Sequence, residues 1–363
     1  MGIEKKQRVR LYGLDLLRIM AMAIVFIGHS ANQFGCNYWY FAPLTLLRST
    51  AMTLFFILSG FVLYYNYYSK NLFDLKIVKN YYIKRVSGIL PTYYLVAVLY
   101  ILFIGKENFG IIVKLLPIEA LGLQSTVSSL FSISHNGGTW FVSCLLISYF
   151  FYPYMQELIK SFSLKINIIL LVGISAFLTY IPFLSEWFSL SGMYENLFCR
   201  GSEFILGILL ARLVLNYKKD LFKEKIKWEN WSALLLFLSP LFLFLVLLYK
   251  DMVILNVPSY QVLRYPLLCC MVIGSGILRL DWVENISIIH VSLKYLSGIA
   301  YEFFLAQFFT WKISEYIIIL LQNDRNVFRV VISFIVCLML ATFLHYLFTK
   351  PISSFMIKTF VKE

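Results

Sequence analysis

The sequence predicts an all-α integral membrane protein that crosses the bilayer about ten times and keeps both termini in the cytoplasm. Of its 363 residues, 60% are hydrophobic and only 14% are charged, and the mean hydropathy is +0.77. Soluble chains have about 45–50% apolar and about 25% charged residues, so this composition excludes a soluble fold. We expect one membrane-embedded domain over residues 1–363, with a basic cytoplasmic N-terminus at 1–12 and a cytoplasmic tail at 349–363.

Ten apolar stretches have the length of about 20 residues that a helix needs to cross the hydrocarbon core. They lie at residues 13–33, 43–66, 86–105, 139–157, 166–183, 198–216, 229–249, 259–280, 291–311 and 327–348. The first follows a basic segment, as in a signal peptide, but Asp15 and Arg18 interrupt it and no clear small-residue cleavage site follows. We therefore expect an uncleaved first span.

The segment between the third and fourth stretches, residues 106–138, contains the apolar run IIVKLLPIEALGL. Lys114, Pro117 and Glu119 make this run too short and too interrupted to cross a membrane. Two interpretations stay open, an interfacial helix lying over a cavity and a plain connector.

The net charge of +13 is explained by topology. When the loops are assigned to alternate sides of the membrane, most Lys and Arg residues outside the stretches fall on the side of the termini. The positive-inside rule places that side in the cytoplasm. We therefore expect membrane lipids as partners and no nucleic acid, and the sequence makes no prediction about oligomeric state.

The six cysteines show no metal-ligand spacing, and most lie in apolar stretches as small hydrophobic residues. The sequence therefore predicts no metal site. Cys36 and Cys199 both fall near the predicted outer face, so a disulfide between them stays open.

The first stretch, GLDLLRIMAMAIVFIGHS, carries three ionisable residues in an apolar environment. Such residues usually face a protein interior or an aqueous cavity. Arg18 and His29 lie eleven positions apart, which at about 100° per residue returns a helix to the same face, roughly 16 Å further along its axis. This shared face predicts a functional pair. Asp15 either pairs with Arg18, three positions away, or anchors the helix at the interface.

Further polar residues in the apolar stretches admit two interpretations each. Arg200 and Glu203 are opposite in charge and three positions apart, which suits an internal salt bridge or part of an acceptor site. Glu302, with Gln307 five positions later, either makes a structural hydrogen bond or takes part in catalysis. Arg48 begins the second stretch and either reaches the outer interface or lines the site.

The other histidines carry weaker signals. His290 and His345 fall at the predicted inner boundary, where an interfacial role is expected. His135 precedes NGGTWF in the outer segment, and its role is left open between substrate contact and a plain loop position.

Several strings in order along the chain resemble the family-3 membrane acyltransferases, polytopic enzymes that acylate sugars of surface glycans. They are LDLLRIMAMAIVFIGHS with LFFILSGFVLYY, YYIKRVSGILPTYY, TWFVSCLLISYFFYP, EFILGILLAR, SGIAYEFFLAQFF and LHYLFTKPI. Each string is weak because apolar runs match easily. Together they cover essentially the whole chain in register, which makes the resemblance strong.

By position, Arg18 and His29 match the first-helix arginine and essential histidine of the family. Arg85 matches the first basic residue of the family's Arg-x-x-Arg motif, but Gly88 stands at the second position, with Lys84 as a partial substitute. This departure weakens the case for two-point binding of an anion.

Two other departures concern the outer half. Leu145 and Leu146 stand where some members carry a pair of glutamates after the tryptophan, so the chain is similar to the shorter members without a fused extracellular domain. Ala306 stands where many members have a histidine before the position of Gln307, so a second histidine role is not expected there.

The resemblance implies a bacterial enzyme of the plasma (inner) membrane. It would transfer an acyl group, most often acetyl, from cytoplasmic acetyl-CoA or another acyl-CoA to a sugar hydroxyl of a cell-surface or lipid-linked glycan. The acyl-CoA is a co-substrate, and no bound cofactor is implied. A multi-pass exporter of a glycan or small molecule is the alternative, because ten helices with an internal polar stripe also suit transport.

The resemblance also implies a division of roles. His29 would take the hydroxyl proton or carry the acyl group transiently. Arg85 and Lys84 would meet the phosphates of the donor, and Arg18 would hold the donor further in or stabilise charge. Trp140, with its aromatic neighbours, either offers a platform for a sugar ring or is an ordinary interfacial aromatic residue.

Overall fold

The fold is built almost entirely from helices. The computed structural model describes residues 10–105, 109–126, 138–189, 195–221, 228–280 and 282–361. The α-helices in these ranges are α1 (Tyr12–Phe34), α2 (Arg48–Tyr67), α3 (Leu75–Phe103), α4 (Phe109–Ala120), α6 (Trp140–Ser161), α7 (Leu164–Trp187), α8 (Leu197–Leu221), α9 (Trp228–Tyr249), α10 (Ser259–Val262), α11 (Arg264–Ile277), α12 (Trp282–Asn285), α13 (Ser287–Gly298), α14 (Ala300–Leu320), α15 (Asn326–Leu344) and α16 (Lys350–Phe360).

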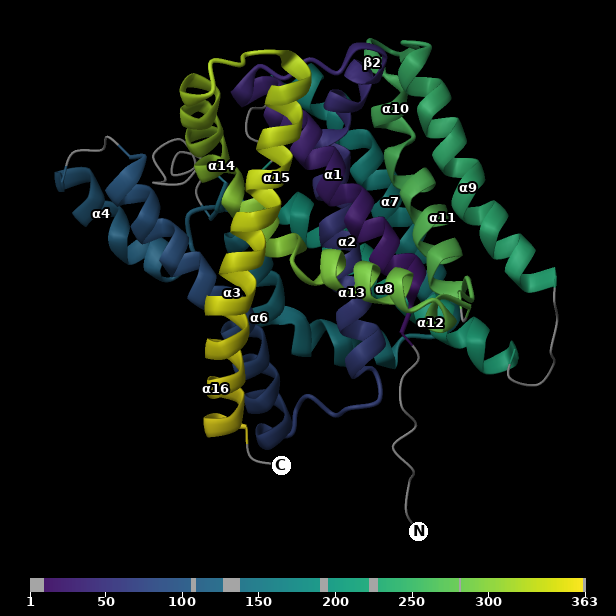
Figure 1. Cartoon of the computed structure of the whole chain (residues 1–363). Helices are drawn as coiled ribbons and strands as arrows, with labels where there is room; N and C mark the ends of the chain where they lie inside the picture. The colour runs from purple at the N-terminus through teal and green to yellow at the C-terminus, as the bar shows by residue number, and fades with distance from the viewer. Residues whose placement is uncertain are drawn as a thin grey trace.

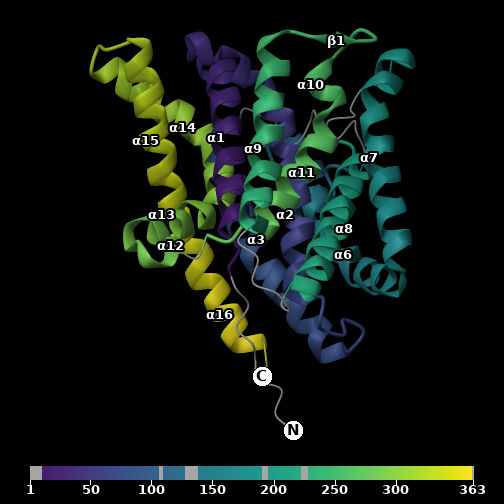
Figure 2. The ribbon, with the colours of Figure 1, turned by 90° about the vertical axis from the view of Figure 1, so that its right-hand side faces the viewer.

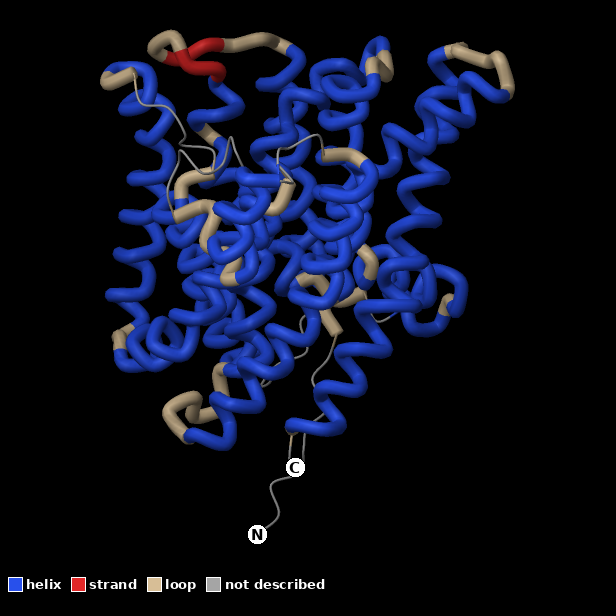
Figure 3. The backbone as a smooth tube through the Cα atoms, turned by 90° about the vertical axis from the view of Figure 1, so that its left-hand side faces the viewer, coloured by secondary structure: helices blue, strands red, loops and turns tan. Residues whose placement is uncertain are grey.

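Three short elements complete the described fold. A 3-10 helix, η1 (Trp39–Leu47), precedes α2, and a π-helix, η2 (His345–Thr349), joins α15 to α16. Strands β1 (Val253–Ile254) and β2 (Val257–Pro258) pair as an antiparallel hairpin, which lies at the end of the molecule opposite α16 (Figure 3). The predicted all-α fold class is confirmed.

Seven segments of the described chain are long and apolar enough to cross a membrane, which makes this a multi-pass membrane protein. They comprise α1, η1 with α2, α3, α7, α9, α14, and α15 with its continuation into α16. Helices α6 and α8 occupy two further predicted stretches but carry more polar residues, and α11 has only 14 residues. The total of ten spans therefore stays a prediction.

The described chain begins and ends at the same end of the molecule, where α1 starts and α16 finishes (Figures 1 and 2). We call this the terminal end and the opposite one the hairpin end. Arg18 therefore lies toward the terminal end of α1, and His29 lies toward its hairpin end. Which end faces the cytoplasm stays a prediction from the distribution of basic residues.

The predicted stretch at 291–311 is wrong in its boundaries. Helix α13 ends at Gly298, Ile299 leaves the helical conformation, and α14 begins at Ala300. Figure 1 shows α13 lying across the bundle while α14 runs along it. The reason is that α13 carries polar residues such as Ser292 and Lys294 and ends at a glycine, which has low helix propensity. The apolar run resumes only on α14.

Two other segments are also helical. Of the two interpretations left open for the outer segment, the helix is the one observed, because residues 109–120 form α4. The predicted tail after residue 349 continues as α16, with Pro351 in its first turn, where a missing N–H is tolerated. Helix α16 packs against α3.

Helices α2 and α8 make the most extensive helix contact of the described fold, and two glycines permit it. A Cβ added to Gly207 would lie 1.9 Å from the carbonyl oxygen of Ile57, and one added to Gly60 would lie 2.0 Å from that of Phe204. Small residues let membrane helices approach this closely. The two backbones touch here, so nothing flexible is available to move aside.

Replacing Gly207 with alanine is therefore expected to destabilise the protein by at least ~1–3 kcal/mol, the usual cost of overpacking. The matched control is Gly173→Ala on α7, where an added Cβ would meet nothing within 4 Å. Thermal unfolding of both purified variants in detergent measures the difference. Equal melting temperatures for the two variants would contradict the close contact between α2 and α8.

All six cysteines are free thiols. Cys36 and Cys199 are each buried, and the disulfide that the sequence left open between them is not formed. The cysteines therefore pack as small apolar residues.

Candidate active site

A cavity of about 340 Å³ lies among α1, α2, α3, α6 and the junction of α13 with α14. Its lining brings together two of the predicted site residues, Arg18 from α1 and Arg85 from α3. Aromatic side chains make up much of the remaining wall. They are Phe55, Phe56, Phe141, Tyr149, Tyr301 and Phe304.

Arg18 lines this cavity, and none of the side-chain hydrogen bonds shown between described residues involves its guanidinium. Of the two interpretations of Asp15, a direct ion pair with Arg18 is not formed: Asp15 pairs with Arg10 at 2.6 Å, and only its charge acts on Arg18. Arg10 also donates to Ser297 Oγ at 3.2 Å. Asp15 lies in the first turn of α1, so its carboxylate reaches Arg10, which precedes the helix. The Arg18 guanidinium is thereby left available for a ligand.

Arg85 is held between two tyrosine rings at the cavity wall. Its guanidinium carbon lies 5.8 Å from the ring centre of Tyr67 and 6.0 Å from that of Tyr149, distances that favour cation–π attraction. Its buried Nε has no hydrogen-bond partner among the described residues. A buried, underused donor beside a cavity suits recognition of an anionic ligand.

The position of the missing second arginine also faces the cavity. Gly88 belongs to the lining, and a Cβ placed there would meet nothing within 4 Å. Lys84 is half-buried and is not among the residues that line the cavity. At the second basic position of Arg-x-x-Arg, Gly88 therefore leaves open space, and Lys84 does not replace the missing positive charge in the cavity lining.

His29 is fixed by a hydrogen bond from its Nδ1 to Gln307 Oε1, at 2.7 Å. Because a carbonyl oxygen only accepts, Nδ1 carries the hydrogen and Nε2 keeps a free lone pair. Gln307 is 1% exposed. Its position in the sequence gave no sign of this contact, since 278 residues separate the two side chains. A free Nε2 on an oriented imidazole is what a general base or a nucleophile requires.

Arg48 lies beside His29 rather than only at an interface. Its side chain packs over Gly28, where an added Cβ would come within 2.9 Å of Arg48 Cβ. From there its positive charge acts on the imidazole of His29. A cation at this point can stabilise negative charge that develops near His29 during a reaction.

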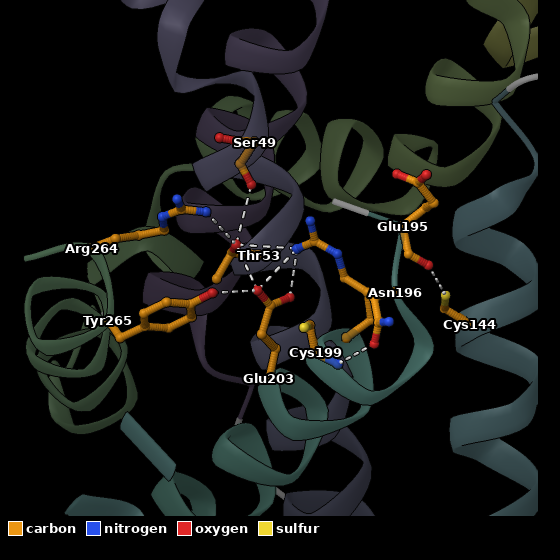
Figure 4. Close-up of polar contacts among 10 residues, drawn as sticks. Ser49, Thr53, Cys144, Glu195, Asn196, Cys199, Glu203, Arg264 and Tyr265 are labelled. Atoms are coloured by element: carbon orange, nitrogen blue, oxygen red, sulfur yellow. Dashed lines mark hydrogen bonds and ion pairs between the residues drawn. The ribbon is translucent and has the colours of Figure 1, made fainter. Parts of the chain in front are cut away.

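Arg200 and Glu203 form the internal salt bridge that their spacing predicted, with Nη1 and Oε2 2.7 Å apart and both side chains buried. Figure 4 shows the surrounding network. Thr53 from α2 donates to Glu203 Oε1 at 2.9 Å, and Tyr265 from α11 donates to it at 3.0 Å. Arg264 reaches Thr53 Oγ1 at 3.5 Å. The cluster therefore joins α2, α8 and α11 and lies outside the cavity lining.

Trp140 belongs to this cluster. The guanidinium carbon of Arg200 lies 5.4 Å from the centre of a Trp140 ring. Its neighbours Phe141 and Tyr149 line the cavity, whereas Trp140 does not. The aromatic surface that faces the cavity thus comes from other residues of the same helix.

Glu302 is paired with His345, whose Nδ1 lies 3.0 Å from Glu302 Oε1. Glu302 is 2% exposed, and within the described part of the chain its Oε2 has no hydrogen-bond partner. The sequence placed His345 at an interface because nothing in it reveals that this side chain of η2 reaches Glu302 on α14. His290 contacts Tyr12. His135 lies outside the described residues.

Comparison with known proteins agrees with this architecture. A family model described as an acyltransferase domain matches residues 11–347. The acyltransferase MdmB of Streptomyces mycarofaciens is 27% identical over 238 residues, which cover 57% of this chain and 58% of that protein. The chain therefore spans less than two thirds of the length of this relative. No solved structure matches. Because the family model covers nearly the whole chain, the protein belongs to the family 3 acyltransferases.

Proposed function

We propose that the protein transfers an acyl group, most often acetyl, from acyl-CoA to a sugar hydroxyl of a cell-surface or lipid-linked glycan. The main observation behind this proposal is that one face of α14 contacts both the cavity and His29. Tyr301 and Phe304 line the cavity, and Gln307, one turn further on, holds the imidazole. A donor in the cavity would therefore present its far end toward His29.

The charges suit an anionic donor. Arg18 and Arg85 supply positive charge to the cavity, and the described lining contains no carboxylate. Both arginines lie toward the terminal end, the side that the distribution of basic residues predicts to be cytoplasmic. Acyl-CoA is confined to that compartment, and its phosphates are natural partners for guanidinium groups.

In the proposed reaction, His29 accepts a proton from the acceptor and returns it to the leaving group. Its Nε2 removes the proton of the acceptor hydroxyl, and the hydroxyl oxygen attacks the thioester carbonyl. The C–O bond forms, the C–S bond breaks, and the proton passes from the imidazolium to the leaving sulfur. Arg48, the cation next to His29, would stabilise the oxyanion formed on the way. The products are an ester and free CoA thiol.

The first test is the ester content of surface glycans. In a deletion strain, the wild-type gene is expected to restore ester-linked acyl groups that mild alkali releases and mass spectrometry identifies. Glycans with the same ester content in the presence and absence of the gene would contradict the proposal.

Arg85→Gln is expected to raise the KM for acetyl-CoA roughly 10–100-fold, the loss of one charge-assisted contact worth about 1.5–3 kcal/mol. Thiol release from acetyl-CoA by membrane vesicles that contain the acceptor gives KM and kcat. The control is Arg279→Gln, an exposed arginine outside the cavity lining, for which no change is expected. An unchanged KM in Arg85→Gln would remove Arg85 from the donor site.

A further inference from the structure

Two phenylalanines form a wall between the cavity and His29. The ring of Phe304 lines the cavity, and its centre lies 6.0 Å from that of His29. Phe141 also lines the cavity and stacks edge-to-face on Phe304, with ring centres 4.4 Å apart. His29 itself is not part of the cavity lining. Phe304 therefore lies next to both the cavity and His29, with Phe141 packed against it.

Hydrogen bonds fix α14 on both sides of Phe304. Three positions before Phe304, the Tyr301 hydroxyl donates to the carbonyl oxygen of Ile89 on α3 at 3.0 Å. Three positions after it, Gln307 is bonded to His29. Phe304 lies on the same face of the helix between these two anchored residues. Both rings are also buried, with Phe141 8% and Phe304 7% exposed.

The size of the cavity sets which part of the donor meets this wall. A volume of about 340 Å³ is at the low end for ligand pockets, so it suits the arm of a thioester and not a whole acyl-CoA. With the anionic part of the donor drawn toward Arg18 and Arg85, the acyl group is the leading end. It arrives where Phe304 separates the cavity from His29.

We propose that Phe304, supported by Phe141, limits the transferred group to a short acyl chain and so determines the acyl specificity of the enzyme. This inference rests on the proposed function. An acetyl group adds one methyl beyond the carbonyl, whereas each further methylene must displace a ring that contacts both Phe141 and His29. Replacing Phe304 with a smaller residue would open this space to longer chains.

The experiment uses inverted membrane vesicles from a deletion strain that carries the acceptor glycan and expresses each variant. Acetyl-CoA is supplied together with butanoyl-CoA or hexanoyl-CoA, and mass spectrometry measures the ester-linked chains that mild alkali releases. Phe304→Ala is expected to raise the ratio of butanoyl to acetyl transfer at least ~10-fold, since one methylene changes specificity by roughly 10–200-fold. The matched control is Phe308→Ala, one turn further along α14 and outside the cavity lining, which should keep the wild-type ratio.

The outcomes separate the two proposals. If no vesicle transfers any acyl group, the proposed function fails. If the wild type transfers acetyl but Phe304→Ala keeps the same chain-length profile, only the inference about Phe304 is overturned. Wild-type transfer of hexanoyl as readily as acetyl also overturns it. If Phe304→Ala does not fold, as size-exclusion chromatography would show, Phe304→Leu tests the same shift with a smaller cavity.

Discussion

Replacing His29 with glutamine is expected to lower acyl transfer by about 10²–10⁴-fold, the usual contribution of a positioned acid–base group. Glutamine preserves much of the volume and can still contact Gln307, but it has no basic nitrogen to accept the hydroxyl proton. A route through a transient acyl-histidine is lost equally, because it requires the same free Nε2. Thiol release from acetyl-CoA and ester formation on the glycan should therefore fall together.

The control for this variant is another histidine with a tertiary contact. His290→Gln removes an imidazole that lies 2.8 Å from the Tyr12 hydroxyl at the terminal end, away from the cavity lining. It should retain wild-type transfer. Both variants should elute as the wild type does in size-exclusion chromatography. A folded His29→Gln protein with normal transfer would remove His29 from the reaction and leave the proton acceptor to be sought elsewhere.

The parts of the site within one helix could be predicted from the sequence. Arg18 and His29 both lie on α1, where the backbone fixes their angular relation, so their spacing was enough to place them on one face of the helix. The salt bridge of Arg200 with Glu203 was predicted for the same reason. Composition and the span-length apolar stretches likewise predicted the fold class, since both can be read from the sequence without knowledge of tertiary contacts.

The parts of the site between helices could not be predicted in this way. The contact of His29 with Gln307, and that of Glu302 with His345, depend on the register of α14 against α1 and η2. One sequence carries no signal for such a register. Asp15 shows how a local rule can fail, because the carboxylate is equally able to reach Arg10 outside the helix. The position of Phe304 between the cavity and His29 could not be predicted for a further reason. The sequence does not distinguish one phenylalanine from another in an aromatic-rich helix.

Neutralising Glu203 is expected to have the largest effect on folding. Its carboxylate is 1% exposed and forms a buried ion pair with Arg200, with Arg264 close by through Thr53. Removing one partner of a buried ion pair typically costs about 3–5 kcal/mol, because the remaining charge stays buried without compensation. Glu203→Gln should therefore lower the melting temperature of the purified protein sharply and reduce its yield.

A rescue distinguishes this explanation from a simple packing defect. The double variant Glu203→Gln with Arg200→Met removes both charges and keeps apolar volume next to Phe56 and Trp140, which flank the guanidinium. A buried pair replaced in this way often costs little, so the double variant should be more stable than Glu203→Gln alone. The control is Glu315→Gln, whose carboxylate is 49% exposed in its pair with Arg329 and should matter by no more than about 1 kcal/mol. A double variant less stable than the single one would mean that Arg200 is held chiefly by Trp140 and Phe56, with Glu203 contributing separately through Thr53 and Tyr265.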